Sequence, residues 1–575
     1  MIGMILGIWD GHDSGAALMD GEKILFAVNE ERLTRRKLEV RFPERSIGAC
    51  LTYAGIGRSD ITDIAISTSD FAKTLTRVFP SLKEEYYLIR RRKRPPKGYT
   101  FFKKRVKYRL TEFSPSFLTE AISRKMIDGR LKRMGFDGYR LHLIDHHESH
   151  AAAAALCSGF DEGLVITLDG LGDGLSGSVY VFGEPGRLKR RAVLSARHSL
   201  GIFFEHVTNL MNMRELEDEG KVMALANYAY PIEDSVNPLM NLIAVDGLSI
   251  RCRHSSLAMY EELKKILWQY PSEQFAYMAQ RTLEVKILEL VKNAMKETGM
   301  GNLCLAGGIF SNVKVNRLIR LLPDVGGCFV FPHMGDGGLA LGSAIEASRR
   351  LNSLKQVPLD NVFLGPSFSD EEIEDALRDS GLKYYRSDDI AAEAAELIAK
   401  GGIVFWFQGA MELGPRALGG RSILARADSE DIKDTLNLRL KKRVWYQPFC
   451  PSMLEEDAAD LLADYDGTPN RFMTMAYMVK EDKRKHLRGV INVDGSCRPQ
   501  IVPRESSLYG RLLEEVKRLT GYGCLLNTSL NVHGEPMVCS PRDAVKTMID
   551  TGNEYLASGN FVVKGSFSPS PVGRD

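Results

Sequence analysis

Short apolar runs separated by glycine-rich turns dominate the first part of this chain. The apolar run at residues 4–9 leads into the turn 10–15, and the same order recurs where residues 164–168 lead into 169–177. This alternation predicts strands joined by tight turns. Strands are expected at residues 4–9, 16–19 and 23–29, and again at 164–168 and 178–182.

Two further glycine-rich turns open helices. The turn 306–312 follows the apolar run 303–305, and the turn 332–338 begins an alanine-rich helix that continues to Ala347. Backbone N–H groups in such turns approach anions closely. One such turn alone is typical of ordinary structure, but four in this order favour a ligand cleft and are similar to the nucleotide-binding fold of actin, heat-shock ATPases and sugar kinases. The candidate nucleotide-binding residues are Asp13, Ser14, Gly170, Gly172, Gly307, Gly308, Asn312 and Gly335.

The length of the chain predicts more than one domain. Its 575 residues exceed what one hydrophobic core usually serves. Arginines and prolines at 349–367 are typical of a domain exit, and a new helix is predicted at 370–380. We therefore expect an α/β domain at 1–350, a linker at 351–368 and a second α/β domain at 369–575.

One predicted helix start carries two histidines four residues apart. In Asp145-His146-His147-Glu148-Ser149-His150 the aspartate predicts an N-cap, so His146 and His150 face the same way. Asp169 ends the apolar run 164–168, and Asp336 lies in a later turn. Two imidazoles with carboxylates bind a first-row metal and leave positions open for water or substrate. Two surface histidines are the alternative, but the two aspartates favour the metal site.

Composition excludes some classes of protein. The net charge of +2 at pH 7 does not indicate a partner. The nine cysteines include no Cys-x-x-Cys pair, which argues against a structural zinc site and a secreted disulfide framework and favours a reducing cytoplasm. The first residues are expected to form a strand and not a signal peptide, and no apolar run is long enough to cross a bilayer.

Arginines in turns rich in glycine and proline characterise the second part of the chain. Because guanidinium groups bind phosphate oxygens in pairs, these turns favour a pocket for small anions. The alternative is that the loop arginines pair with surface acids. The segments are Gln408 to Ile423, the run Lys441-Lys442-Arg443, Gln447 to Pro451, Val493 to Gln500 and Leu525 to Pro536.

Six motifs distributed over the whole chain belong together. They are His12-Asp13-Ser14, Asn29-Glu30-Glu31-Arg32-Leu33-Thr34-Arg35, the His146/His150 helix, Glu219-Gly220-Lys221-Val222-Met223, Gly414-Pro415-Arg416-Ala417-Leu418-Gly419 and Asn527-Thr528-Ser529. This set resembles the O-carbamoyltransferases of the nodulation-factor and aminoglycoside-antibiotic type (NodU and TobZ). The resemblance implies an α/β fold with two parts. The first is a two-lobed domain of the actin and heat-shock ATPase type, similar to the subunit that places threonylcarbamoyl on tRNA, and the second is a YrdC-like α/β domain.

The resemblance also implies a reaction in two steps. The second domain would form carbamoyl-adenylate from carbamoyl phosphate and ATP with Mg²⁺. The first would pass the carbamoyl group to a hydroxyl of a small-molecule acceptor, a natural product or a sugar, using iron(II) or another divalent transition metal. By residue-for-residue match the metal set is His146, His150, Asp169 and Asp336. Neither nucleic acid nor a membrane is expected as a partner, and a homodimer is compatible with the sequence.

Chemistry suggests roles within this scheme. Because carbamoyl phosphate and ATP are polyanions, the second domain needs cationic and neutral donors. His12, in the first turn, is the candidate base for the acceptor hydroxyl. Lys221 is a candidate for holding the adenylate phosphate, or else it forms an ion pair with a neighbouring acid. The nominated donors are Arg416, Arg421, Lys441 or Lys442, Arg498, Asn527 and Ser529.

Several positions depart from the family pattern. Ala410 stands where the family usually carries Arg, Gly420 where it carries Asn, the segment 444–447 lacks an expected Glu and Arg, and Asn227-Tyr228-Ala229 replaces Pro-Tyr-Gly. If Ala410 and Gln447 line the adenylation pocket, carbamoyl phosphate binds more weakly or in another register.

A basic segment at 90–109, interleaved with aromatic residues, lies outside the resemblance. It is either a solvated insertion or a site for RNA, an anionic lipid or an anionic acceptor. A tRNA-modifying transferase is therefore one alternative function. A nucleotide-dependent ATPase or sensor is another, although it has no use for the arginine turns. The sequence leaves open the acceptor, the oligomeric state and the native metal, since iron, manganese and zinc all use this ligand set.

Overall fold

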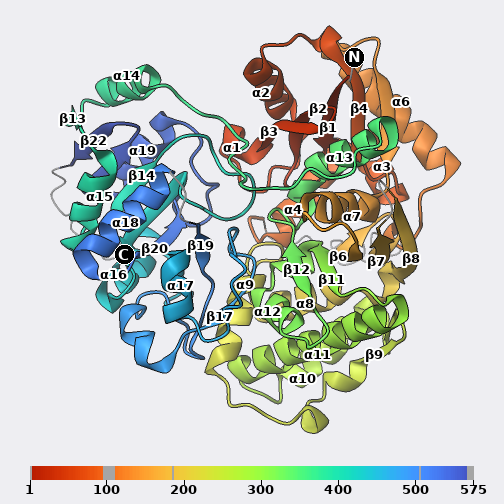
Figure 1. The fold of residues 1–575 in the computed structure, drawn as a ribbon. Helices are drawn as coiled ribbons and strands as arrows, with labels where there is room; N and C mark the ends of the chain where they lie inside the picture. Colours follow the sequence, from red (N-terminus) through yellow and green to blue (C-terminus); the bar gives the residue numbers. More distant parts are fainter. Residues whose placement is uncertain (1–2, 95–109, 184–186, 504–506, 566–575) are drawn as a thin grey trace. The chain divides into compact units, whose positions relative to one another are not determined.

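The computed structural model describes residues 3–94, 110–183, 187–503 and 507–565, which form two compact units (Figure 1). Unit 1 comprises Met1–Glu30 and Leu38–Asp360, and unit 2 comprises Glu31–Lys37 and Asn361–Asp575. Both units combine helices with β-sheets, so the predicted α/β class is confirmed.

Unit 1 contains two five-stranded sheets of the same topology, in the orders β3-β2-β1-β4-β5 and β12-β11-β6-β7-β8. In each sheet three antiparallel strands are extended by two parallel ones. The strands are β1 (Met4–Trp9), β2 (Gly15–Asp20), β3 (Lys23–Asn29), β4 (Ile61–Ser67), β5 (Arg140–Ile144), β6 (Gly163–Gly172), β7 (Leu175–Phe182), β8 (Leu188–Ser195), β11 (Asn302–Ala306) and β12 (Gly327–Val330). The repeated topology gives the two lobes that the sequence predicts.

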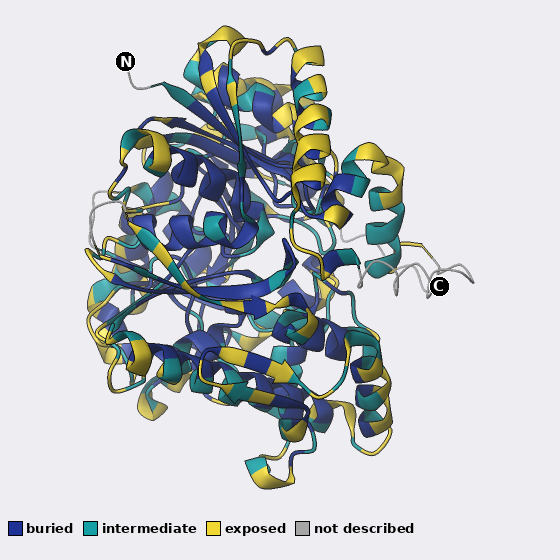
Figure 2. Ribbon diagram, turned by 90° about the vertical axis from the view of Figure 1, so that its right-hand side faces the viewer, coloured by how far each residue is buried: buried dark blue, intermediate teal, exposed yellow. Residues whose placement is uncertain are grey.

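Two helices connect the lobes, α7 (His146–Cys157) and α13 (Leu339–Asn352). Helix α7 packs on β6 and β11, α13 packs on β1 and β4, and the two helices pack on each other. A Cβ at Gly342 would lie 2.3 Å from the Ser149 carbonyl oxygen, so this glycine permits the close approach of the two helices. Helix α7 and strands β1 and β6 are almost wholly buried (Figure 2). The histidines of α7 are therefore held by the core of unit 1.

The other elements of unit 1 surround these layers. They are α2 (Glu44–Ala54), α3 (Phe71–Val78), α4 (Pro80–Arg90), α6 (Phe117–Arg133), α8 (Leu200–Leu210), α9 (Glu219–Leu225), the hairpin β9 (Ile243–Asp246) and β10 (Ser249–Cys252), α10 (Ser256–Leu267), α11 (Ser272–Thr298) and α12 (Val313–Arg320). Helix α1 (Glu30–Thr34) begins at the last residue of the first segment of unit 1.

Strands β1 and β3 and helix α14 (Asp370–Ser380) begin and end as predicted, but the turn predicted at 169–177 is wrong. Strand β6 continues to Gly172 and pairs with β7 through an irregularity between Leu168 and Gly172. The actual turn consists of Asp173 and Gly174, whose φ angles are 52° and 79°, as a two-residue hairpin loop requires. The glycine at 172 thus belongs to a strand.

Unit 2 is built on an eight-stranded sheet in the order β13-β22-β21-β14-β15-β20-β16-β19. Helices α15 and α18 pack together over a core that contains Trp406 and Leu525. The strands are β13 (Tyr384–Arg386), β14 (Val404–Phe407), β15 (Arg421–Arg426), β16 (Cys450–Leu454), β19 (Gln500–Val502), β20 (Cys524–Ser529), β21 (Tyr555–Ser558) and β22 (Phe561–Lys564), with the small pair β17 (Tyr477–Met478) and β18 (Ser496–Cys497). The helices after α14 are α15 (Ile390–Ala399), α16 (Glu430–Thr435), α17 (Glu455–Leu461), α18 (Leu508–Thr520) and α19 (Pro541–Thr551).

Two predictions from composition can be compared with the fold. All nine cysteines lie in described segments and are free. Among the described residues, no helix combines the length and apolar character needed to span a bilayer.

Candidate active site

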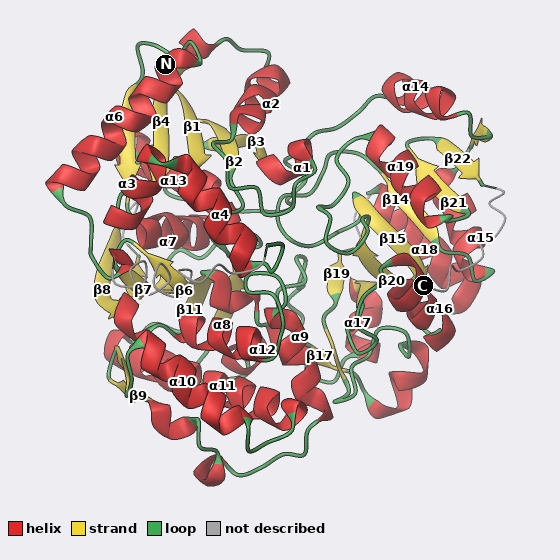
Figure 3. Cartoon of the chain, turned by 180° about the vertical axis from the view of Figure 1, so that it is seen from behind, coloured by secondary structure: helices red, strands yellow, loops and turns green. Residues whose placement is uncertain are grey.

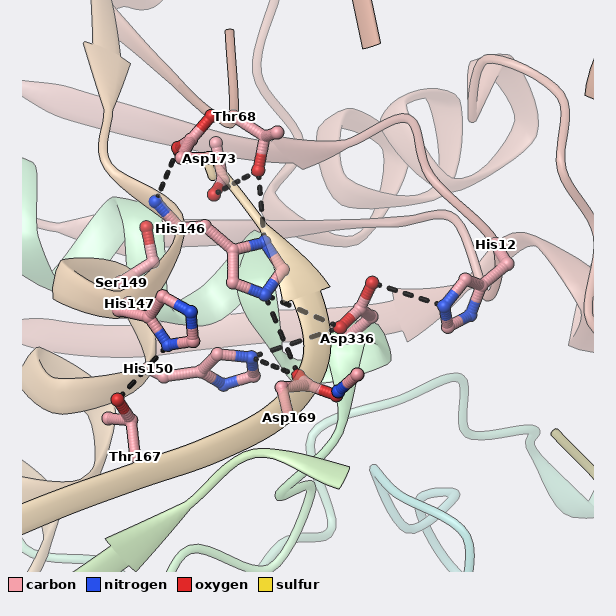
Figure 4. Close-up of polar contacts among 12 residues, drawn as sticks. His12, Thr68, His146, His147, Ser149, His150, Thr167, Asp169, Asp173 and Asp336 are labelled. Carbon is pink, nitrogen blue, oxygen red and sulfur yellow. Dashed lines mark hydrogen bonds and ion pairs between the residues drawn. The ribbon is translucent and has the colours of Figure 1, made fainter. Parts of the chain in front are cut away.

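Helix α7 presents two histidines on one face. The Asp145 side chain caps the helix by accepting a hydrogen bond from the backbone N–H of Glu148 at 2.9 Å. His146 and His150 are about one turn apart, and their rings meet edge to face with centroids 4.9 Å apart (Figure 4). The local arrangement is the one that the Asp145 cap and the spacing predict.

Two carboxylates from separate elements complete the cluster. Asp169 lies in β6, and Asp336 lies in the short helical turn before α13. The Nε2 atom of His150 is 3.1 Å from Oδ2 of Asp169 and 3.9 Å from Oδ1 of Asp336. The Nε2 atom of His146 is 3.6 and 3.7 Å from the same two oxygens. The four candidate ligand atoms all lie within 4.8 Å of one another. The structure thus brings together the whole predicted metal set.

The surroundings of His146 fit a metal ligand. Its Nδ1 is hydrogen-bonded to the Thr68 hydroxyl at 3.0 Å, which fixes the ring orientation. Its Nε2 is buried and has no hydrogen-bond partner among the described residues. An oriented imidazole whose second nitrogen is buried and faces carboxylates is a suitable donor for a divalent transition metal.

The charges of the cluster favour an added cation. Burial would lower the pKa of His146, but the carboxylates of Asp336 and Asp169 raise it to about 9. Burial would raise the pKa of Asp336, but His12 and His146 hold it well below its usual value. The carboxylates are therefore ionised and attract positive charge, which a divalent ion would supply.

The third histidine of α7 does not join the cluster. The Nδ1 atom of His147 is hydrogen-bonded to the Thr167 hydroxyl at 3.0 Å. Burial, together with the charges of His146 and His150, lowers the pKa of His147 to about 3. This neutral ring packs α7 against β6 and is distinct from the two candidate ligands.

Replacing Gly172 with alanine is expected to disturb the cluster. The new Cβ would lie 2.3, 2.4 and 2.5 Å from three ring atoms of His146, so the ring or the strand must move. We expect metal affinity to fall about tenfold or more and the free energy of unfolding to fall by about 1–3 kcal/mol. Calorimetric metal titration and thermal melting measure the two effects. Gly48→Ala is the matched control, since its Cβ would meet nothing within 4 Å. Unchanged metal affinity in Gly172→Ala would count against His146 as a ligand.

His12 lies at the edge of the cluster, in the turn after β1. Its Nε2 is 3.2 Å from Oδ2 of Asp336 (Figure 4), and its carbonyl accepts a hydrogen bond from the Trp9 indole at 2.7 Å. Since an ionised carboxylate only accepts, Nε2 carries the proton in the neutral ring and Nδ1 carries the lone pair. Nδ1 is buried and has no hydrogen-bond partner in the described part of the chain. His12 is thus oriented as a general base would be.

Lys221 forms an ion pair with a neighbouring acid, which is the alternative role predicted for it from the sequence. Its Nζ is 2.9 Å from Oδ1 of Asp218. Burial would raise the pKa of Asp218, but hydrogen bonds from Arg214 and Lys221 lower it to about 2. The structure thus provides a local partner for the lysine, and its phosphate-binding role stays a prediction.

Some of the glycines predicted to bind nucleotide make close contacts near Asp169. Gly307 has a φ of 100°, and a Cβ there would lie 2.1 Å from a carbonyl oxygen of β6. A Cβ at Gly308 would lie 3.0 Å from Oδ1 of Asp169, and one at Gly170 would lie 3.3 Å from a carboxylate oxygen of α8. Gly335 has open space around it. Close backbone approach therefore accounts for Gly307 without a nucleotide.

The polar residues predicted for the same site differ in their surroundings. Asn312 caps α12, and its amide group exchanges hydrogen bonds with Gln280 at 2.8 and 3.1 Å, which commits it to the fold. Asp13 has a φ of 58°, and its carbonyl accepts from Asn29 at 3.0 Å. The hydroxyl of Ser14 is buried and has no hydrogen-bond partner among the described residues. Of these residues, Ser14 retains a free polar group.

In unit 2 a buried carboxylate shapes the turn that carries Arg416. The Oε1 atom of Glu412 accepts hydrogen bonds from the backbone N–H groups of Leu418, Gly420 and Arg421 at 2.8, 3.1 and 3.2 Å. Three hydrogen bonds to one charged acceptor hold the loop in a single conformation. The position of Arg416 is therefore determined by the fold.

Three arginines gather around the thiol of Cys450 in β16. The Nε and Nη2 atoms of Arg498 lie 3.0 and 2.8 Å from its Sγ. Burial, reinforced by the charge of Arg498, lowers the pKa of Arg416 to about 9, and burial also lowers the pKa of Arg443 to about 9. In the segments that the structure describes, no carboxylate forms an ion pair with any of the three. Half-buried cations without a counter-ion are suited to binding an oxyanion.

Arg443 and Cys450 are the members of this group that the sequence analysis missed. Within the run 441–443, the residues predicted as donors to phosphate are Lys441 or Lys442. The guanidinium carbon of Arg443 lies 4.1 Å from the centre of the Phe449 ring, and its Nε donates to Asn437 at 2.6 Å. These contacts are local, between the helical turn 436–440 and the connection 441–449, and only the basic run itself could have indicated Arg443.

Arg421, also predicted as an anion ligand, is engaged by its own loop, and its anion-binding role stays a prediction. Its side chain is fully buried and lies 3.7 Å over the Phe407 ring. Burial lowers the pKa of Arg421 to about 10. Its guanidinium donates to the carbonyl oxygens of Gln408, Gly409, Gly420 and Pro366 at 2.9, 3.1, 3.2 and 3.1 Å. The arginine therefore stabilises the loop that presents Arg416.

The remaining donors nominated in unit 2 also differ in exposure. Lys441 is buried, and its Nζ contacts Ser529 and lies 2.7 Å from the side-chain oxygen of Asn531. Lys442 is exposed. The Nδ2 atom of Asn527 donates to protein oxygens, but its Oδ1 is buried and has no hydrogen-bond partner among the described residues. A ligand donor could still use Asn527.

The departures from the family pattern at Gln447 and Ala410 lie in described segments, and so does the first part of the basic segment. The side-chain oxygen of Gln447 is buried without a hydrogen-bond partner among the described residues, and Ala410 is half-buried. Arg90 pairs with Glu205 and with Glu215, the latter at 2.5 Å. The rest of the basic segment, residues 95–109, lies outside the described residues.

Comparisons with known proteins agree over most of the chain. The family models Carbamoyltransferase N-terminus and Carbamoyltransferase C-terminus match residues 4–345 and 395–565. Nodulation protein NolNO of Sinorhizobium fredii is 34% identical over 572 residues, covering 96% of this chain and 79% of that protein. Nodulation protein U of Rhizobium fredii is 36% identical over 241 residues, covering 41% and 39%. Full-length HypF, solved in a phosphate- and nucleotide-bound form, aligns at a TM-score of 0.32 with 16% identity over 62% of this chain and 56% of that one, too low a score to support any argument.

Proposed function

Given that this chain belongs to the carbamoyltransferase family, we propose that its two units catalyse successive steps. Unit 2 forms carbamoyl-adenylate from carbamoyl phosphate, ATP and water, and releases inorganic phosphate and pyrophosphate. Unit 1 transfers the carbamoyl group to a hydroxyl of a small molecule, such as a natural product or a sugar, and AMP leaves. The observation that carries the proposal is the group of three half-buried arginines in unit 2, which have no carboxylate partner among the described residues.

The chemistry of the first step explains this arginine group. Carbamoyl phosphate and Mg²⁺-bound ATP both present phosphate oxygens, and they repel each other unless cations neutralise them. The guanidinium groups of Arg416, Arg443 and Arg498 bind such oxygens in a fixed fork geometry. Because these cations are half-buried and have no carboxylate partner among the described residues, their attraction for phosphate is stronger than that of a fully exposed arginine.

Unit 1 has the groups needed for the second step. We propose that His146, His150, Asp169 and Asp336 hold iron(II) or another divalent transition metal. Such an ion, when bound, polarises the carbamoyl carbonyl. His12 takes the proton of the acceptor hydroxyl at Nδ1, while Asp336 stabilises the resulting imidazolium through Nε2.

The proposed setting is the cytoplasm. Nine free cysteines suit a reducing compartment. ATP and carbamoyl phosphate are also metabolites of the cell interior.

Arg498→Ala and Arg416→Ala test the first step. Each change removes a half-buried cation from the proposed phosphate site, so pyrophosphate release from ATP and carbamoyl phosphate should fall about a hundredfold or more. Metal content should not change, because both residues lie in unit 2. Arg439→Ala removes an exposed arginine nearby in the sequence and is the matched control. Release at the wild-type rate in both test variants would refute the assignment.

A further inference from the structure

Helix α4 borders the turn that holds His12. The Tyr87 ring meets the His12 ring edge to face, with centroids 5.4 Å apart. Lys83, one helical turn earlier, donates from Nζ to the carbonyl oxygen of Asp10. At its other end the helix is joined to α8 by the ion pair of Arg90 with Glu205. Helix α4 therefore runs from the first turn of unit 1 to α8 (Figure 3), and Lys83 and Tyr87 share the face toward His12.

Helix α3 places two more cations at the same turn. Arg77 binds the Asp10 carboxylate with two hydrogen bonds, from Nε to Oδ2 at 2.9 Å and from Nη2 to Oδ1 at 3.0 Å. The Nζ of Lys73 is 2.8 Å from Oδ1 of Asp10 and lies 3.8 Å from the centre of the Trp9 ring. Two of these cations thus contact the Asp10 carboxylate, and the third, Lys83, contacts the carbonyl oxygen of the same residue.

The three cations at this turn outnumber the single carboxylate of Asp10. Arg77 already satisfies both oxygens of Asp10, so the charge of Lys83 has no carboxylate of its own among the described residues. Burial, together with the charge of Lys73, lowers the pKa of Lys83 well below its usual value. Burial also lowers the pKa of Lys73, although Asp10 opposes the shift and Asp336 does so more weakly. Buried charges are normally paired, so this group would gain stability from an external anion.

We propose that Lys73 and Lys83 form an anion subsite beside His12. This subsite binds a phosphate-type group. The proposal deepens the proposed function, on which it rests. The anion is then either the phosphate of the carbamoyl-adenylate or an acidic group carried by the acceptor. In both cases the subsite lies next to His12, the candidate base, because Asp10 and His12 belong to one turn. The Asp336 carboxylate, which contacts His12, also acts electrostatically on Lys73.

Acetylation of lysines in the full-length protein, read by mass spectrometry, tests the subsite directly. The probes form two matched pairs, AMP with adenosine and glycerol 3-phosphate with glycerol. A phosphate bound at Lys83 should slow its acetylation severalfold, while exposed Lys125 on α6 reacts as before. Protection by AMP but not adenosine assigns the adenylate phosphate. Protection by glycerol 3-phosphate but not by AMP assigns the subsite to an acidic group of the acceptor. If both compounds protect Lys83, the one that binds more tightly identifies the source of the anion.

Variants provide the second measurement. Affinity for AMP and glycerol 3-phosphate is measured by calorimetry in the Arg498→Ala background, so that the proposed site in unit 2 does not contribute. Lys83→Met should lower the affinity for whichever of the two compounds binds by about tenfold or more. Lys83→Arg should largely retain this affinity, and Lys125→Met should not alter it.

The subsite is overturned if millimolar AMP and glycerol 3-phosphate neither protect Lys83 nor bind differently to Lys83→Met and Lys125→Met. A wild-type protein that releases no pyrophosphate but still shows phosphate protection at Lys83 would instead refute the proposed function alone.

Discussion

Simultaneous replacement of His146 and His150 by alanine is expected to lower bound transition metal from about one ion per chain to almost none. Both rings direct Nε2 toward the carboxylates of Asp169 and Asp336. Removing both leaves two aspartates, a donor set that suits hard cations with several waters but holds first-row transition metals weakly. The expected loss is larger than for Gly172→Ala, which only displaces one ligand.

Elemental analysis of protein purified with iron(II), manganese or zinc measures this loss. His142→Ala is the control, because this histidine lies on β5 and pairs with Asp63 at 2.7 Å, away from the cluster. Thermal melting shows whether the double variant is folded. A folded double variant with the wild-type metal content would exclude the site.

The local parts of the metal site could be predicted from the sequence. Asp145 is a recognisable cap, and the spacing of His146 and His150 determines their common face. Asp169 follows an apolar run, so its place on a strand was also evident, although β6 continues past it to Gly172. The approach of Asp336 depends on the packing of α13 between the lobes, and only the presence of a later glycine-rich turn suggested it.

The surroundings of Gly172 and Arg421 could not be predicted from the sequence, for one physical reason. A glycine in a turn and a glycine that makes room for a side chain look alike in sequence, and Gly172 makes room for the His146 ring. Arg416 and Arg421 likewise stand five residues apart in one motif. Arg421 begins β15 and donates to four carbonyl oxygens, whereas Arg416 joins the group at Cys450. Burial separates their roles, and burial is set by tertiary contacts.

The second expected result separates the two steps of the reaction. His12→Ala should retain pyrophosphate release but lose carbamoylated product by about a hundredfold or more, the usual effect of removing a general base. The base acts on the acceptor hydroxyl, whereas adenylate formation is assigned to unit 2. The measurement uses labelled carbamoyl phosphate and an acceptor found by screening hydroxyl metabolites, with both products determined on one preparation.

His12→Gln distinguishes proton transfer from support of the turn. Its amide can donate to Asp336 as Nε2 does, at 3.2 Å in the native protein, but it cannot take a proton as Nδ1 of histidine does. If His12 is the base, the glutamine variant melts near the wild-type temperature and transfers as poorly as the alanine variant. If His12 only supports the turn, glutamine restores transfer. Equal loss of pyrophosphate release and transfer in both variants would remove His12 from the mechanism, because a base for the acceptor has no part in forming the adenylate.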